Sequence, residues 1–288
     1  MTPASETAAS ETPAIVTPAS ETPPGLRRLR VLLLGGTSEA SALAGRLAGD
    51  TRFEATLSLA GITRQPAHSP LPTRSGGFGG AAGLATWLVA GQTDVLVDAT
   101  HPFARRMRDN ARQAAALAGV ALLRLTRPPW AEQPGDRWIA ARDADHAAGL
   151  LGEAPRRVFL ALGAKGLAGF AARPEHSYLV RCIDPPPAEL LPRGAGLVLA
   201  RGPFTLEGEL ALLRAHAIEI LVAKNSGGPA AAAKLAAARM LSLPMVMIGR
   251  PAEAAGRAGS EAPVGAQVES AEAALDWLGA HRATERGV

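Results

Sequence analysis

Short apolar runs alternate with amphipathic stretches from Leu29 onward. The run Leu29–Leu34 ends in two glycines, and residues 38–49 after it have apolar positions at helical spacing. The alternation continues through residues 53–61, 81–91, 93–99, 102–119 and 120–125. A continuous apolar run is typical of a strand that is covered on both faces. The pattern therefore predicts an α/β domain with a parallel, doubly wound sheet in residues 29–142.

The same alternation begins again in the second half of the chain. Apolar runs and helical patterns follow each other through residues 156–170, 177–183, 196–217, 218–241 and 243–251. They predict a second α/β domain in residues 143–252. A stretch rich in Gly, Ala, Pro and Glu, about residues 252–266, then precedes an amphipathic pattern near residues 270–281. We expect residues 253–288 to form a linker and a C-terminal helix.

The first 28 residues have a different composition. They contain TPASET twice and consist mainly of Pro, Ala, Ser, Thr and Glu. Such a segment cannot bury enough apolar surface to offset the entropy of ordering it, so residues 1–28 are expected to be a disordered tail. The chain as a whole has 288 residues, 47% of them hydrophobic, which is enough for two ordinary cores.

Charge and cysteine content exclude several classes of protein. The net charge of +4 is small and dispersed, so we expect no nucleic-acid partner, although it suits an anionic small molecule. Cys182 is the single cysteine, which rules out an intramolecular disulfide, and no Cys/His group has the spacing of a metal site. No apolar run approaches the roughly 20 residues of a membrane span. A cytoplasmic protein without a metal or a membrane partner is expected.

The turn after the first strand is a candidate phosphate site. Gly35, Gly36, Thr37 and Ser38 lie between a strand and a helix, where backbone N–H groups and the positive helix end can hold an anion. The sequence differs from the G-x-G-x-x-G fingerprint of dinucleotide sites. The alternative is a tight turn in which Ser38 caps the helix.

Two further segments could contact a dinucleotide. The second strand ends in SLAGITR, where Ser58, Thr63 and Arg64 are available and no carboxylate competes, which favours NADP over NAD. The alternative is an exposed loop with an incidental arginine. The glycine-rich RSGGFGG segment is expected to be a loop ahead of a helix. It could approach a flat ligand closely and lay Phe78, next to Gly79, against it. A flexible linker is the alternative there.

The third strand ends abruptly in DATHP. In a doubly wound sheet this end lies beside the first glycine turn, so Asp98, Thr100 and His101 are expected to face the ligand. Pro102 is expected to be the first residue of the next helix and Thr100 its cap. His101 could donate a proton or bind a carboxylate. The alternative is structural, with Asp98 and Thr100 capping backbone groups and His101 on the surface.

Lysine is rare, and two lysines occupy matching places in the second half. The chain has Lys165, Lys224 and Lys234 among 30 basic residues, so the other 27 are arginines. ALGAKGL and VAKNSGG each place a lysine just after an apolar strand. Both lysines could bind carboxylates of an anionic ligand. The supporting residues would be Arg181, Arg201, Ser226 and Gly227. The alternative for each lysine is a helix-start residue that points to water.

Eight sequence blocks resemble the precorrin-6A reductases of cobalamin biosynthesis. In chain order they are LLLGGTSEASALA, RSGGFGG, DATHPFA, RPPW, LALGAKGL, RCIDPP, ARGPFTLEGE and VAKNSGGPAAAAKLAAA. The resemblance covers about residues 28–251, and DATHPFA and KNSGG are its most specific blocks. It implies two Rossmann-like domains with parallel sheets and a ligand cleft between them. It also implies NADPH-dependent reduction of one double bond of the tetrapyrrole precorrin-6A, which gives precorrin-6B.

The resemblance also implies roles for particular residues. Gly35 to Glu39 would bind the NADPH phosphates, Ser58 and Arg64 its 2′-phosphate end, and the DATHPFA block, with Ala99 and Thr100, the nicotinamide and the ring. The proton donor stays open between His101, Asp98 and water. A related branch of the family acts on cobalt-precorrin-6A and uses NADH.

Two other classes of protein share part of this pattern, and the sequence leaves the oligomeric state open. A methyltransferase that binds S-adenosylmethionine also has a glycine-rich first turn, but it normally needs an acid at the end of the second strand, which SLAG lacks. A non-catalytic NADPH sensor would have no need of the paired lysine loops. A monomer or a small homo-oligomer is expected.

Overall fold

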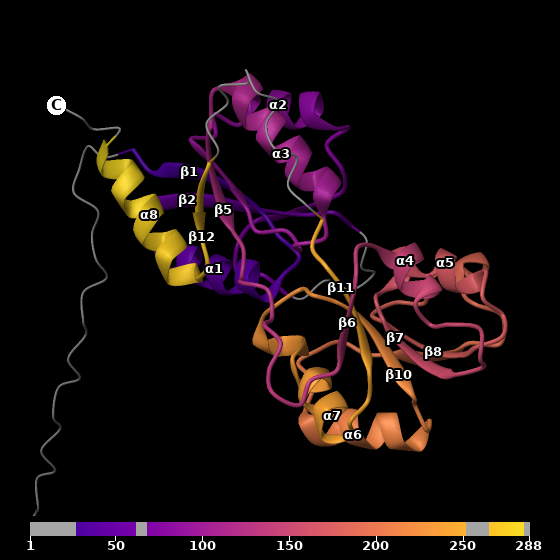
Figure 1. The fold of residues 1–288 in the computed structure, drawn as a ribbon. Helices are drawn as coiled ribbons and strands as arrows, with labels where there is room; N and C mark the ends of the chain where they lie inside the picture. Colours follow the sequence, from indigo (N-terminus) through magenta and orange to yellow (C-terminus); the bar gives the residue numbers. More distant parts are fainter. Residues whose placement is uncertain (1–26, 62–67, 252–264, 285–288) are drawn as a thin grey trace, which may run out of the picture.

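A computed structural model describes residues 27–61, 68–251 and 265–284 of the chain. Two six-stranded sheets form its framework, and all the strand pairs in both are parallel (Figure 1). The predicted parallel α/β class is therefore confirmed. Most of the expected tail and of the expected linker, together with Thr63 and Arg64, lies outside the described residues.

The first sheet has the strand order β12-β5-β4-β1-β2-β3. Its strands are β1 (Leu29–Leu34), β2 (Phe53–Leu59), β3 (Thr73–Ser75), β4 (Val95–Asp98), β5 (Ala121–Leu125) and β12 (Ala266–Val268). Every residue of β4 is buried, because helices cover both faces of the sheet. On one face lie α1 (Ser38–Ala48) and α8 (Ala271–Thr284), and on the other lie α2 (Ala81–Ala90) and α3 (Arg105–Ala118).

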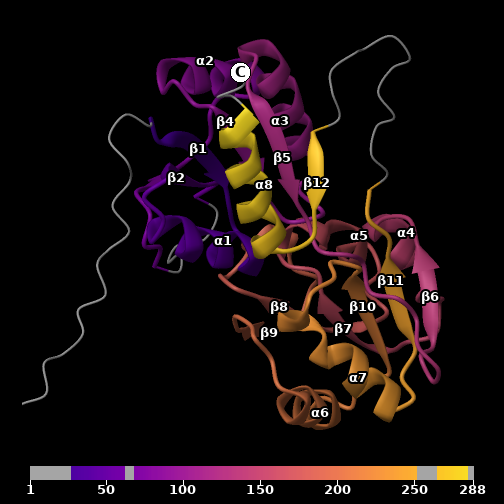
Figure 2. The same ribbon diagram turned by 90° about the vertical axis from the view of Figure 1, so that its left-hand side faces the viewer.

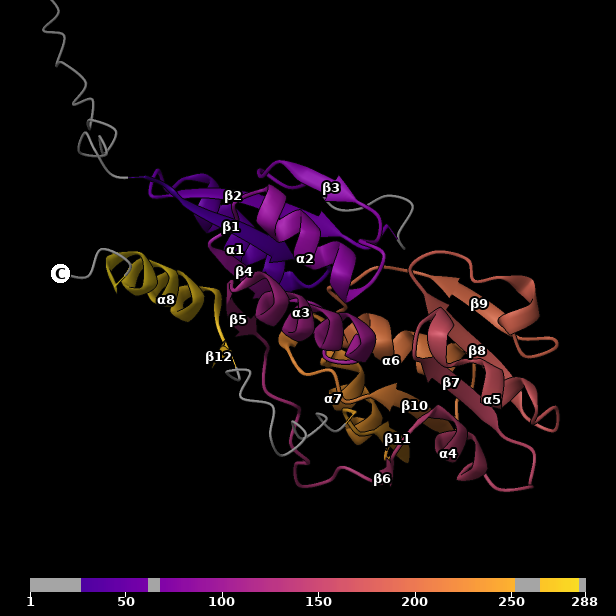
Figure 3. The ribbon, with the colours of Figure 1, turned by 90° about the horizontal axis from the view of Figure 1, so that it is seen from above.

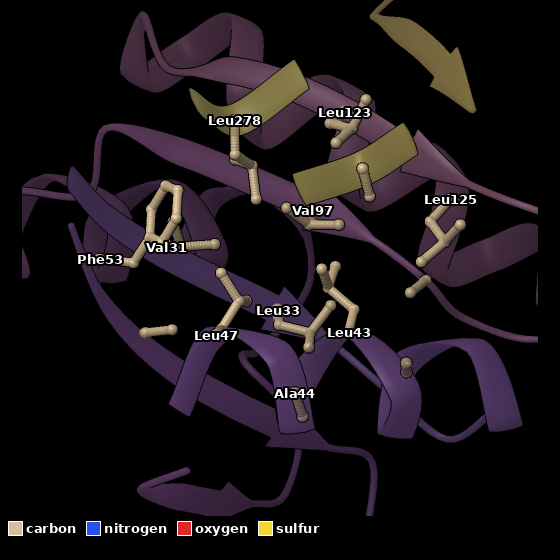
Figure 4. Close-up of a cluster of buried hydrophobic side chains, with 14 of the residues drawn as sticks. Val31, Leu33, Leu43, Ala44, Leu47, Phe53, Val97, Leu123, Leu125 and Leu278 are labelled. Atoms are coloured by element: carbon tan, nitrogen blue, oxygen red, sulfur yellow. The ribbon is translucent and has the colours of Figure 1, made fainter. Parts of the chain in front are cut away.

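The core of this half is built from apolar side chains of helices and strands far apart in the sequence. Figure 4 shows Leu43 and Leu47 of α1 and Leu278 of α8 over Val31 and Val97 of the central strands. All five are at most 3% exposed. Because α8 closes this core, the end of the described chain is part of the first half's structure.

The second sheet has the order β6-β11-β10-β7-β8-β9. Its strands are β6 (Trp138–Ala141), β7 (Arg157–Ala161), β8 (Ser177–Cys182), β9 (Gly196–Leu199), β10 (Ile220–Lys224) and β11 (Met245–Ile248). One face is covered by α4 (Ala144–Gly149) and α5 (Ala168–Ala171), and the other by α6 (Leu206–Ala215) and α7 (Ala233–Met240). Figure 3 shows β9 and β3 at the outer edges of their sheets.

The chain passes between the sheets twice. After β5 it enters the second sheet at β6, which pairs with β11, and after β11 it returns to the first sheet as β12, which pairs with β5 (Figure 2). Strand pairing thus assigns β6 to the second sheet, although it precedes the boundary expected at residues 142 and 143. We propose that the first unit ends near residue 126 and regains residues 266–284, which include the strand β12 inside the expected linker and helix segment.

Two local expectations are wrong. Pro102 does not begin a helix, because residues 102–104 form a turn in which the Ala104 N–H donates to the His101 carbonyl over 2.7 Å, and α3 begins at Arg105. The RSGGFGG segment is not entirely a loop, because Arg74 and Ser75 belong to the edge strand β3. The second difference arises from the pairing of β3 with β2, which local composition does not show.

Candidate functional site

The carboxyl ends of the central strands of the two sheets face each other. The Lys224 ammonium at the end of β10 lies 5.7 Å from the centre of the Phe103 ring, which follows β4. The Arg127 Nε–H, after β5, donates to the Ser226 carbonyl over 2.8 Å. In open parallel sheets ligands bind at the carboxyl ends of strands. The candidate site is therefore the region between these two sets of strand ends.

The turn after β1 has the backbone expected of a phosphate-binding turn. Gly36 has a φ of 111°, which an L side chain rarely adopts, and a Cβ at Gly35 would lie 2.6 Å from Leu57 Cδ1. Thr37, not Ser38, caps α1: its Oγ1 accepts from the Ala40 N–H over 3.1 Å. Ser38 is exposed at the start of the helix, whose N–H groups can bind an anion.

The residues after β4 are held close to this turn. The Thr37 hydroxyl donates to the Ala99 carbonyl over 2.8 Å, which joins the ends of β1 and β4. Asp98 is 4% exposed, and its Oδ1 accepts from the Thr100 N–H over 3.1 Å and from the Thr100 hydroxyl over 2.6 Å. Thr100 therefore does not cap α3 as expected. The buried Asp98 carboxylate instead fixes the conformation of the peptide that leads to His101.

His101 lies among positive charges. Its Nδ1 accepts from the Phe103 N–H over 3.2 Å, which leaves Nε2 to carry the proton of the neutral ring. Burial lowers the pKa of His101 to about 4, and the charges of four cations add to the effect. The four are Arg127, Lys224, Arg250 and Lys234. At neutral pH His101 is therefore uncharged and can donate a hydrogen bond through Nε2.

A small hollow lies beside the first turn. It is lined by Thr37, Glu39, Thr100, Pro102, Leu125, Thr126 and Arg127. The Thr126 residue is 7% exposed, and its hydroxyl oxygen has no hydrogen-bond partner among the described residues. A buried hydroxyl without a partner is unfavourable, and a ligand group in the hollow would satisfy it.

Arg127 connects the two halves at this hollow. Its Nη1 donates to Glu39 Oε2 over 2.6 Å, and both side chains are at most 16% exposed. This ion pair neutralises the carboxylate that directly follows the phosphate-binding turn in the sequence. Glu39 therefore binds Arg127 and presents no uncompensated charge to an anionic ligand.

The KNSGG and RPPW blocks pack against each other. Asn225 Oδ1 accepts from the Trp130 N–H over 2.7 Å, and its Nδ2 donates to the Trp130 carbonyl over 2.9 Å. Trp130 Nε1 in turn donates to the Gly228 carbonyl over 3.0 Å. A Cβ at Gly227 would lie 2.0 Å from the Pro128 carbonyl oxygen. These residues form a joint where the chain first passes between the sheets.

The chain is similar to characterised reductases along nearly all of its length. The family model "Precorrin-6x reductase CbiJ/CobK" matches residues 30–279. The chain belongs to the precorrin-6x reductase family. A precorrin-6A reductase of Rhodobacter capsulatus is 49% identical, over 90% of this chain and 99% of the relative. A solved structure titled "CobK precorrin-6A reductase" superposes with a TM-score of 0.81 at 48% identity and covers 90% of this chain and 100% of the other.

Cobalt-precorrin-6A reductases are more distant relatives of this chain. That of Priestia megaterium is 29% identical, over 77% of this chain and 90% of the relative. Membership makes the chain an oxidoreductase of cobalamin biosynthesis. No helix among the described residues could cross a membrane, and no group of three metal-binding side chains occurs in that part of the chain.

The two lysines that the sequence predicts to bind the substrate differ in burial. Lys224 donates to the Leu162 carbonyl over 2.7 Å, and burial, with the charge of Lys165, lowers its pKa. Lys165 is exposed in the turn Ala164–Gly166. Lys224 is the last residue of β10 and Lys165 follows β7, so the structure brings both lysines to the same edge of the second sheet, as expected. Ser226 and Gly227 lie there too, but both are buried in the joint.

Arg181 and Arg201 have different surroundings. Arg181 is 8% exposed, its Nη1 donates to Glu209 Oε1 over 2.5 Å, and its guanidinium lies 3.8 Å from the centre of the Phe204 ring. Glu209 thus neutralises the charge of Arg181 within the second half. This arrangement does not support the predicted contact between Arg181 and the substrate. Arg201 is exposed after β9, toward the edge of the second sheet.

Several residues of the site escaped the sequence prediction. Arg127, Arg250, Thr126 and Lys234 all lie near the meeting strand ends. Lys234 is 4% exposed, donates to the Ala231 carbonyl over 2.6 Å and lies 4.5 Å from the Trp130 ring centre. Burial, with the charge of Arg181, lowers its pKa to about 7. The rarity of lysine is the one signal in the sequence that could have drawn attention to Lys234.

Proposed function

We propose that this chain reduces precorrin-6A to precorrin-6B with NADPH. The observation that carries the proposal is the meeting of the two sets of strand ends, where a glycine turn suited to phosphates faces a group of buried or half-buried cations. The glycine turn can hold a dinucleotide, and the group of cations can hold an anionic ring. The similarity to the Rhodobacter capsulatus precorrin-6A reductase supports this substrate.

The residues present fit a dinucleotide. The positive φ of Gly36 and the helix start at Ser38 suit a pyrophosphate, and the unpartnered Thr126 hydroxyl suits a ribose or amide group. The end of β2, at Leu59, Ala60 and Gly61, has no carboxylate, which favours NADPH over NADH. When bound, the nicotinamide supplies a hydride to one carbon of the substrate double bond.

The residues of the second half fit the carboxylates of a tetrapyrrole. Lys224, Lys165 and Arg250 lie at the ends of its central strands, where they can bind side-chain carboxylates and so orient the ring. Those carboxylates would also offset the positive charges that face His101. The pKa of His101 would then rise from about 4, so that Nε2 could hold the proton that is added beside the hydride.

The comparisons favour the metal-free substrate. The identity of 49% to a precorrin-6A reductase exceeds the 29% to the cobalt-precorrin-6A reductase of Priestia megaterium. A mass-spectrometric assay with precorrin-6A and with its cobalt analogue, each with NADPH and NADH, tests the proposal. A product heavier by two hydrogens from precorrin-6A and NADPH is expected. Turnover of the cobalt substrate alone, or of neither, would contradict the proposal.

Loss of either paired lysine is expected to weaken substrate binding. Lys224→Ala and Lys165→Ala each remove one charge-assisted contact, worth about 1.5–3 kcal/mol, so the KM for precorrin-6A should rise roughly 10- to 100-fold. The KM for NADPH should change little. Arg46→Ala is the control, because Arg46 is a basic residue that pairs with Glu272 on the face of the first sheet covered by α1 and α8. An unchanged KM in both lysine variants would contradict the placement of the substrate.

A further inference from the structure

An arginine of the neighbouring strand β3, which the sequence pattern did not single out, lies beside the carboxyl end of β2. Arg74 of β3 is the register partner of Ser58 of β2, and Leu34, at the end of β1, is the partner of Ser58 on the other side. The Ser58 carbonyl accepts from the Gly35 N–H over 2.9 Å. Arg74 is therefore level with the phosphate-binding turn and two strands away from it.

The Arg74 guanidinium is held in place by neutral groups. Its Nη1 donates to Ser58 Oγ over 2.8 Å and to the Gly76 carbonyl over 3.0 Å, and its Nη2 donates to the Gly77 carbonyl over 3.2 Å. The centre of the Phe78 ring lies 3.8 Å from its Cζ. Phe78 thus supports the arginine rather than lying open for a flat ligand, and Trp87 packs edge-on against it at 5.9 Å.

The charge of Arg74 has no acidic partner among the described residues. Its contacts there are the three oxygens and the ring, and its Nε–H and second Nη2–H donate to no protein acceptor. Two other arginines at strand ends differ: Arg127 is paired with Glu39, and Arg181 with Glu209. A half-buried, preoriented guanidinium with a spare donor edge is suited to a phosphate.

We propose that Arg74 binds the 2′-phosphate of NADPH and thereby selects NADPH over NADH. The inference rests on the proposed function and deepens it, because the end of the second strand is where the adenosine ribose lies in doubly wound sheets. The buried Ser58 fixes the guanidinium rather than contacting the phosphate itself. The glycines at 76 and 79, with φ of 113° and 79°, let the loop fold back around the arginine.

A pair of nucleotides that differ only in the 2′-phosphate tests the proposal without the reaction. Adenosine 2′,5′-bisphosphate and AMP would be titrated calorimetrically into the full chain and into Arg74→Gln and Arg74→Lys. We expect the wild-type chain to bind the bisphosphate at least tenfold tighter than AMP. Arg74→Gln should bring that ratio close to 1 with AMP binding unchanged, and Arg74→Lys should give an intermediate ratio.

Arg52→Gln is the matched control. Arg52 lies at the other end of β2, also beside a phenylalanine ring at 5.1 Å, but it is paired with Asp50. Its substitution should leave the ratio at the wild-type value. An unchanged ratio in Arg74→Gln would overturn the proposal, and so would a parallel loss of AMP binding, which would give Arg74 a purely structural role.

Turnover assays on the same preparations separate the two proposals. Equal rates of precorrin-6A reduction with NADPH and NADH in the wild-type chain would keep the reductase and overturn the role of Arg74. The wild-type chain could instead reduce precorrin-6A with neither NADPH nor NADH, while Arg74→Gln still lowers the ratio of bisphosphate affinity to AMP affinity. That result would support the 2′-phosphate site and overturn the proposed reaction.

Discussion

Gly227→Ala is expected to lower the free energy of unfolding by about 3 kcal/mol. Gly227 has a φ of 70°, and a Cβ there would lie 2.0 Å from the Pro128 carbonyl oxygen. The neighbour is backbone, so it cannot turn aside as a side chain can. Relief of the clash requires the 127–130 segment to move away from β10, which breaks the joint. We therefore expect a higher KM for precorrin-6A as well, since Arg127 belongs to that segment.

Urea-induced unfolding of the wild-type chain and of Gly227→Ala measures the change in unfolding free energy. Gly45→Ala is the matched control: Gly45 lies on the exposed face of α1, and a Cβ there meets nothing within 4 Å. Alanine should raise the stability of that helix by about 0.5–1 kcal/mol. A loss of less than about 1 kcal/mol in Gly227→Ala would show that the joint is loosely packed, contrary to the geometry described here.

The protein is expected to lose stability as the pH falls from 6.5 to 4, with His101 as a main cause. Burial, reinforced by the nearby cations, lowers the pKa of His101 from 6.5 to about 4. Between these values the unfolded chain binds a proton that the folded chain does not, so stability rises with pH across this window and falls on acidification. A shift of this size corresponds to at most about 3 kcal/mol.

His101→Asn should remove this part of the pH dependence. Asparagine can still accept from the Phe103 N–H, but it does not titrate, so the difference in unfolding free energy between pH 7 and pH 4.5 should shrink. His176 is buried, and burial lowers its pKa too, so some acid sensitivity should remain. The exposed His216→Asn serves as the control. Equal acid sensitivity in wild type and His101→Asn would contradict the assignment.

The parallel fold could be predicted because its central strands are apolar along most of their length. All residues of β4 are buried, as are most of β1 and β10, so each appears as a continuous apolar run. The short edge strands β3 and β6 were missed because they lack such a run and have exposed positions. A strand of this kind forms through pairing with its neighbour, and local sequence carries little trace of that pairing.

Part of the site could be predicted from topology. Glycines after the first strand and the acid, hydroxyl and imidazole after β4 are brought together because neighbouring parallel strands end at one edge. The role of KNSGG could not be predicted, because its partner Trp130 lies 95 residues away from Asn225. The internal pairing of Arg181 with Glu209 and the register of Arg74 against Ser58 likewise depend on contacts that appear only in the folded chain.

The chain passes between the two sheets twice, and this affects the order in which the protein can fold during synthesis. The strand β12 and the helix α8 are translated after the whole second sheet, yet β12 covers the edge of β5, and α8 covers Val31 and Val97. Until then the nascent chain exposes an open sheet edge and an apolar face, both prone to aggregation. The second sheet, with all its strands between residues 138 and 248, can be completed earlier on the ribosome. The half whose synthesis begins first therefore completes its fold last.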